Sequence, residues 1–236
     1  MTEFEKQFRE VQELLEFNDF NQTIKRVIDF TLDTENIDFY TKTNEFLNWL
    51  DHNEKEDEDK KTRLKTLLDE LHAFLSKKEC HNHQTIISVK NLQKVYNASF
   101  GLGPINLDIK TGEIIGLVGE NGNGKTTLLR SLCGELHPTS GTINYQFQYD
   151  DLYDLRTKLV YIPQRTDTWR GSMYENLEFT ASCYGYSPEE NNLVVDLVIT
   201  RLGLRKFRKH YWNNLSSGYK MRFELARMLL RKPKFY

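Results

Sequence analysis

The sequence predicts an α/β domain preceded by a small all-α bundle, and two observations support this prediction. The first hundred residues contain neither glycine nor proline, and their apolar residues recur with the period of a helix. From Gly112 onward, a short apolar run at 114–118 precedes a glycine-rich loop and a helical pattern at 126–132. A strand, a tight loop and a helix in this order are typical of the start of an α/β domain.

Four helices are predicted in the first eighty residues. Apolar residues lie on one helical face in 4–15 and in 20–32, and a third cluster spans 46–50. Asn18 and Asp19 are a plausible N-cap pair before the second helix. After a run of charges, apolar residues repeat most regularly in 64–75. Each of these faces needs a packing partner, so the region is expected to be a helical bundle.

The predicted domain boundary lies near residue 82, where helical periodicity gives way to strand-like residues and turns. Strand-like residues begin at Ile86, so we expect a helical domain at 1–82 and a second domain at 83–236. Helical patterning returns between about 170 and 214.

The bulk composition is that of a soluble globular protein. With 39% hydrophobic and 28% charged residues, the chain has no apolar run near the roughly 18 residues that a membrane span needs. The cysteines Cys80, Cys133 and Cys183 show no metal-like pairing, which favours a reducing compartment and predicts a cytoplasmic protein. Cys80, His81 and His83 lack a fourth metal ligand nearby, so a polar linker is the preferred interpretation of that cluster.

Charge is unevenly distributed along the chain. Residues 1–80 hold 12 basic and 20 acidic residues, a balance of −8, whereas residues 81–236 hold 20 and 14, a balance of +6. The basic excess accompanies the glycine-rich loop, where a nucleotide polyphosphate would bind. A nucleic acid partner is therefore not expected.

The glycine-rich loop carries the pattern G-x-x-x-x-G-K-[ST] in full. Its residues are Gly119, Glu120, Asn121, Gly122, Asn123, Gly124, Lys125 and Thr126. Glycines allow positive φ angles, so successive backbone N–H groups converge on phosphate oxygens at the start of a helix. Lys125 is expected to reach the β- and γ-phosphates of ATP, Thr126 to ligate Mg²⁺, and Thr127 to contact the α-phosphate. The pattern alone does not distinguish kinases, GTPases, helicases and other P-loop families.

The surroundings of the loop resemble those of ABC-type ATPases. The stretch 112–129 is similar to their Walker A region. Tyr96, 23 residues before Gly119, stands where that family carries an aromatic residue that stacks on adenine. The stretch Tyr-Ile-Pro-Gln that ends at Gln164 resembles the Q-loop, whose glutamine contacts Mg²⁺ or the attacking water.

The sequence Leu-Ser-Ser-Gly-Tyr at 215–219 resembles the ABC signature. The resemblance implies that Ser216, Ser217 and Gly218 bind the γ-phosphate held by an opposite subunit. Ser217 replaces the family's usual first glycine, and Tyr219 replaces its usual glutamine. A serine at this point could also be an ordinary N-cap of a helix. The ABC interpretation is favoured because all the landmarks occur in the order found in that family.

The resemblance covers residues 86–236 and implies an incomplete ABC ATPase, an α/β P-loop NTPase with a helical subdomain at about 170–214. The chain stops where family members begin the strand that carries the Walker B aspartate and leads to the catalytic glutamate. Of the catalytic groups, Lys125 and Gln164 are expected to be present. We expect an ATPase as the parent protein and, in this chain, at best weak nucleotide binding without hydrolysis, because no alternative carboxylate pair is evident.

The function that the resemblance favours is the ATP-binding subunit of an ABC transporter. It implies a head-to-tail dimer with a second ABC domain and docking on a separate transmembrane subunit at the inner face of the cell membrane. One alternative is a soluble ABC ATPase of translation or repair. Another makes the N-terminal bundle the active part and the ATPase region a sensor.

Overall fold

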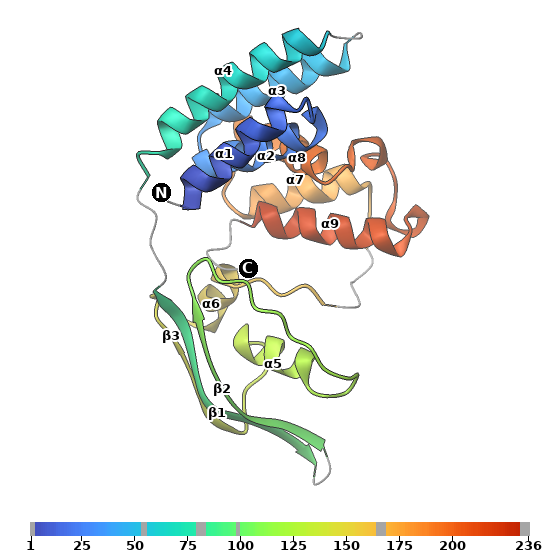
Figure 1. Ribbon diagram of the computed structural model, residues 1–236. Coiled ribbons are helices and arrows are strands. Elements are labelled where there is room, and N and C mark those ends of the chain that lie inside the picture. Colours follow the sequence, from blue (N-terminus) through green and yellow to red (C-terminus); the bar gives the residue numbers. More distant parts are fainter. Residues whose placement is uncertain (1–2, 53–55, 79–83, 98–99, 164–168, 232–236) are drawn as a thin grey trace. The chain divides into compact units, whose positions relative to one another are not determined.

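The computed structural model describes residues 3–52, 56–78, 84–97, 100–163 and 169–231 (Figure 1). The chain divides into two compact units, which are described separately. A helical unit joins the first 79 residues to 164–232, and a sheet unit contains 80–163.

The helical unit contains the bundle predicted from the sequence. Its helices are α1 (Glu3–Glu16), α2 (Phe20–Thr34), α3 (Ile37–Asp51) and α4 (Asp57–Leu75). All four predicted helices are therefore confirmed. Asp19 caps α2 as expected, since its carboxylate accepts a hydrogen bond from the Gln22 amide at 3.1 Å.

The same unit contains the helices from the second half of the chain. They are α7 (Met173–Cys183), α8 (Pro188–Arg201) and α9 (Ser217–Leu230), with the short 3₁₀ turns η1 (Arg205–Phe207) and η2 (Trp212–Asn214). Reciprocal capping boxes begin α7, with Ser172 and Glu175, and α8, with Ser187 and Glu190. These caps satisfy amide groups that a helix start leaves without partners, which explains where the two helices begin.

The sheet unit is built on three antiparallel strands. They are β1 (Thr85–Asn97), β2 (Phe100–Lys110) and β3 (Ser140–Tyr145), in the order β2-β1-β3. Two helices, α5 (Lys125–Leu132) and α6 (Leu152–Lys158), pack with the sheet. The apolar core joins β1 to both helices through Ile87, Val89, Leu92, Leu128, Leu132, Leu155 and Leu159.

The predicted strand at 114–118 is wrong for the described structure. This segment has no regular secondary structure, and the residues Ile114 and Val118 are 98% and 99% exposed. A strand requires a hydrogen-bonded neighbour, and the three strands of the described sheet pair only with one another. The predicted helix after the loop is confirmed as α5, which begins at Lys125.

Burial of one face of α5 should decide how firmly that helix is held. Leu128 is buried in the core, whereas its neighbour Leu129 is 39% exposed. We expect Leu128→Ala to lower the opening free energy of α5 amides by about 2–5 kcal/mol. Leu129→Ala should lower it by less than about 1 kcal/mol. Hydrogen exchange of α5 in the two variants measures the difference, and equal effects would contradict this packing.

Candidate nucleotide-binding site

The glycine-rich loop leads directly into α5. Residues 119–123 are exposed, and Gly124, at φ 82°, is the residue that precedes the helix. Its carbonyl accepts a hydrogen bond from the Leu128 amide at 2.9 Å. The positive φ angle favours glycine here, and a Cβ atom at Gly124 would also displace Cδ1 of Leu102, 2.6 Å away. The first amide groups of α5 are thereby presented toward the loop.

Lys125 folds back over the loop that precedes it. Its ammonium donates to the carbonyl of Gly119 at 2.7 Å and to that of Glu120 at 2.8 Å. An ammonium has three N–H donors, so these two bonds leave one for a phosphate oxygen. Thr126 is exposed in the first turn of α5. The loop backbone, the lysine and the helix N-terminus together fit a polyphosphate chemically.

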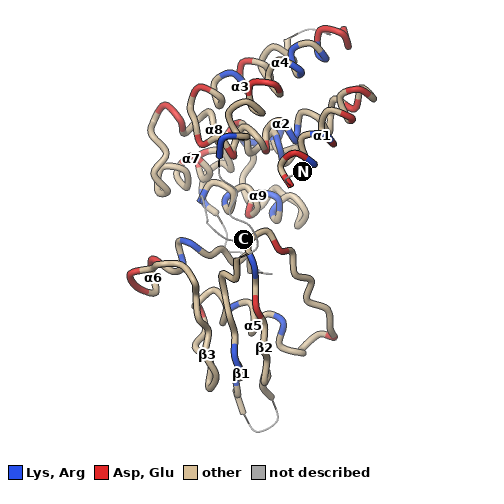
Figure 2. The backbone as a smooth tube through the Cα atoms, turned by 60° about the vertical axis from the view of Figure 1, so that its left-hand side comes forward, with Lys and Arg blue, Asp and Glu red and all other residues tan. Residues whose placement is uncertain are grey.

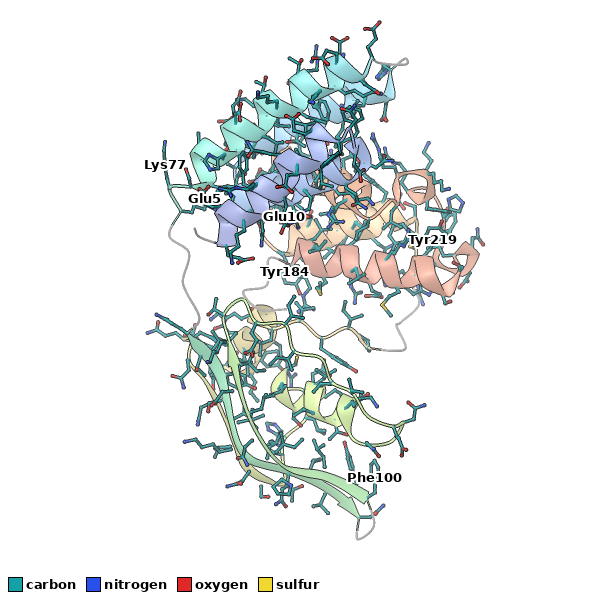
Figure 3. The ribbon with its side chains drawn as sticks, viewed as in Figure 1. Glu5, Glu10, Lys77, Phe100, Tyr184 and Tyr219 are labelled. Carbon is teal, nitrogen blue, oxygen red and sulfur yellow. The ribbon has the colours of Figure 1, made fainter. Side chains whose placement is uncertain are left out.

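The structure brings Tyr96 to the same helix. The Tyr96 hydroxyl lies 3.3 Å from Oγ1 of Thr127, which is buried at the start of α5. The tyrosine ring is 48% exposed and lies 5.5 Å from the ring of Phe100, which is labelled in Figure 3. A half-exposed aromatic face beside a phosphate loop is suited to stacking on a base. That role of Tyr96 stays a prediction.

The far end of α5 is fixed by side chains from other elements. Tyr145 donates to the carbonyl of Leu132 at 2.8 Å, and the Arg156 guanidinium donates to the carbonyl of Gly134 at 2.7 Å. Burial raises the pKa of Tyr145 above its usual value, so its hydroxyl stays a donor. These bonds satisfy carbonyls near the helix end, where hydrogen-bond partners within the helix run out.

The signature stretch lies in the helical unit at the start of α9. Ser216 is its N-cap, and Ser216, Ser217 and Gly218 are all exposed. The Ser216 side chain makes no capping hydrogen bond, although its carbonyl accepts from the Lys220 amide at 2.9 Å. A Cβ atom at Gly218 would meet no other atom within 4 Å. The N-terminus of α9 is therefore open to an anion from solvent, as the signature interpretation requires.

Tyr219 shows what the departure from the usual signature does in this chain. Its side chain is labelled in Figure 3, and its ring packs against that of Phe207, with centroids 4.0 Å apart. The guanidinium of Arg222, which also lies on α9, is 5.4 Å from the centroid of the Tyr219 ring. Tyr219 therefore fixes the first turn of α9 to the turn that follows α8.

The sequence prediction missed a buried polar cluster on α9. Trp169 Nε1 donates to Oε1 of Glu224 at 3.0 Å, and Nη2 of Arg227 lies 3.2 Å from the other carboxylate oxygen. The Trp169 ring stacks on that of Trp212, with centroids 5.1 Å apart. Glu224 is only 4% exposed, so its charge needs these partners. A glutamate inside an apolar helical run was the available signal in the sequence.

Four residues that the sequence interpretation singled out are not placed by the structure. Gln164 of the Q-loop lies outside the described residues, as do Cys80, His81 and His83. Within the part of the chain that is described, no three His, Cys, Asp or Glu side chains are grouped to hold a metal.

Comparison with known proteins identifies the family. Residues 102–236 match the family described as ABC transporter. The chain belongs to this family. It is 35% identical over 160 residues to the methionine import ATP-binding protein MetN 1 of Acinetobacter baylyi, covering 63% of this chain and 45% of that protein. It is 31% identical over 152 residues to the zinc import ATP-binding protein ZnuC of Haemophilus influenzae, covering 64% and 52% respectively.

The fold is also that of the ABC ATPases. The cbiO1 protein of Clostridium perfringens, part of the ABC transporter complex cbiONQ, superimposes with a TM-score of 0.56 and 29% identity over 64% of this chain and 63% of that one. The chain spans about half the length of the curated relatives it matches. The predicted α/β ABC fold, preceded by a helical region that the family match does not include, is confirmed.

The buried carboxylate of Glu224 gives a test of how α9 is held. We expect Glu224→Ala to lower the free energy of unfolding by about 1–3 kcal/mol, because the buried indole N–H of Trp169 loses its acceptor. Glu224→Gln keeps an acceptor for the indole and should lower it by about half as much. Urea unfolding followed by tryptophan fluorescence measures both effects. The exposed Glu45 on α3 supplies the control Glu45→Ala, and an equal loss there would contradict the assignment.

Proposed function

We propose that this chain is the ATP-binding part of an ABC transporter, in which ATP binding and hydrolysis by the whole protein drive transport through a membrane partner. The observation that carries the proposal is the glycine-rich loop that places Lys125 at the N-terminus of α5, within a chain of the ABC transporter family. The relatives described above are named as transport components, which favours this function over a role in translation or repair.

The binding roles follow from the chemistry of each group. The loop amides and Lys125 bind the phosphates, Thr127 contacts the α-phosphate, and Tyr96 stacks on adenine. Thr126 contributes a hydroxyl ligand to Mg²⁺, and Gln164 is the second proposed ligand. When bound, Mg²⁺ neutralises phosphate charge.

A second ABC domain completes the proposed site. The exposed start of α9, with Ser216, Ser217 and Gly218, supports this part of the proposal because its backbone amides can donate hydrogen bonds to a γ-phosphate held by another subunit. We propose a head-to-tail dimer in which each phosphate loop faces the signature of the other subunit.

The membrane partner is proposed as a separate polypeptide or a segment outside this sequence. Among the described residues, no helix is both long enough and apolar enough to cross a bilayer. The proposed location is therefore peripheral, at the inner face of the cell membrane. The two curated relatives described above are named as ATP-binding proteins for the import of methionine and of zinc.

Removal of the Lys125 charge tests nucleotide binding. We expect Lys125→Ala to weaken binding of ATP with Mg²⁺ at least about tenfold, because a charge-assisted bond to phosphate is lost. Lys90→Ala removes one charge from an exposed position on β1 and should leave the affinity within about twofold. Titration calorimetry measures both affinities. Equal affinities for Lys125→Ala and the wild type would remove the basis of the proposal.

The ring of Tyr96 tests adenine recognition separately from phosphate binding. Tyr96→Phe keeps the ring and loses only the contact with Thr127, so ATP affinity should fall by less than about threefold. Tyr96→Ala removes the stacking face and should weaken binding by about tenfold, in line with 1–3 kcal/mol per stacked base. Inorganic triphosphate has no base, so its affinity should be the same in both variants. A Tyr96→Ala protein that binds ATP as tightly as Tyr96→Phe would exclude the stacking role.

A further inference from the structure

Helix α8 is apolar around more than half of its circumference. Its buried side chains are Val194, Val195, Leu197, Val198 and Ile199, each no more than 1% exposed. At about 100° per residue, these positions and the buried Asn191 span about 200°. A helix with so wide an apolar surface needs partners on two sides.

The two sides of α8 are covered by parts of the chain that are far apart in sequence. The helices α7 and α9 contact it, and so do α2 and α3 of the N-terminal bundle. In turn, α1 packs on α2, and α4 packs on both α2 and α3. One continuous core contains Val27, Ile28 and Leu47 of the bundle together with Leu197 and Phe223 of the later helices. The bundle therefore has no separate core of its own.

Polar contacts fix the position of α8 on the bundle. Arg201 holds Asp29 through two bonds, Nε to Oδ1 at 2.6 Å and Nη2 to Oδ2 at 3.0 Å. Asn44 Nδ2 donates to the carbonyl of Leu193 at 3.1 Å. A bidentate arginine–carboxylate pair fixes orientation as well as distance, so these bonds determine the register of α8 against α2 and α3.

Charge complementarity extends along the turn that follows α8. Arg205 Nη2 lies 2.7 Å from Oδ2 of Asp51, the last residue of α3. Five basic residues lie within 201–209, whereas the first eighty residues carry a net charge of −8. The tube in Figure 2 shows the acidic positions concentrated on the bundle helices. An acidic bundle and a basic turn attract each other before the apolar surfaces meet.

We propose that α8 is the docking surface for the chain's own N-terminal bundle, so that α1–α4 and α7–α9 form one cooperatively folded body. The bundle then moves with the signature helix α9, which packs on α8. A molecule that binds the bundle would thereby act on the signature. The inference rests on the contacts of the helical unit and not on the proposed transport function.

Native-state hydrogen exchange of the full chain in increasing urea tests this inference. We expect amides of α2, α3 and α8 to merge into a single opening transition, because neither layer keeps a complete core without the other. The opposite result is a transition in which α2 and α3 lose protection while α8, α7 and α9 remain protected. That result would show a separable bundle and would overturn the proposal.

A charge reversal with a matched control gives a second test. Asp29→Arg should speed exchange in both α2 and α8 by at least about tenfold, because two arginines then face each other at the interface. Glu16 pairs with Lys61 inside the bundle at 2.9 Å, so Glu16→Arg changes charge equally without touching α8. Exchange in α8 should then stay within about threefold of the wild type. Unchanged α8 exchange in Asp29→Arg, or an equal effect of the two reversals, contradicts the proposal.

Two further variants test the proposal even if the Asp29→Arg protein does not fold or express. Asp29→Asn retains the shape of the side chain and should speed α8 exchange by about threefold to tenfold. The double variant Asp29→Arg with Arg201→Asp restores opposite charges across the interface and should recover part of the protection lost in Asp29→Arg. Failure of both variants to change α8 exchange in these directions would also overturn the proposal.

Discussion

The phosphate loop depends on the burial of one face of α5. Leu128 and Leu132 fix this helix against β1, and bonds from Tyr145 and Arg156 hold the carbonyls near its far end. Gly124, at φ 82°, is the residue through which the loop enters this anchored helix. A loop that would otherwise lose entropy on binding an anion is thereby fixed in advance by packing that lies outside it.

In the helical unit, α8 is the helix on which the other helices depend, as the phosphate loop depends on α5 in the sheet unit. It supports α7 and α9 on one side and the bundle on the other, so a single helix connects the exposed start of α9 with the N-terminal residues. This arrangement also explains part of the charge asymmetry. Not all of the basic excess after residue 80 is explained by phosphate binding, because Arg201 and Arg205 pair with carboxylates of the bundle. Long-range ion pairs leave no local pattern from which this could be inferred.

Helices with complete apolar faces were predictable from the sequence, and α1, α2 and α4 follow their periodicity closely. For α3, the apolar pattern predicts only the C-terminal part, because the first half of the helix buries polar residues. One of them is Thr43, whose hydroxyl lies 2.8 Å from that of Thr31. Tyr96 lies beside Thr127 at the start of α5, and its stacking on adenine, which its spacing from the loop predicts, stays a prediction. Pairing of Trp169 with Glu224 could not be predicted, since 55 residues separate them and neither lies in a recognised motif.

The segment 114–118 has a consequence for how this chain behaves in solution. Its apolar side chains extend into water from a backbone that belongs to no described ladder, and Val118 is one residue from the glycine-rich loop. Extended apolar segments of this kind readily accept a strand from another molecule. Self-association through this segment would hold the start of the glycine-rich loop against another molecule. The oligomeric state of a preparation and its nucleotide affinity should therefore vary together with protein concentration.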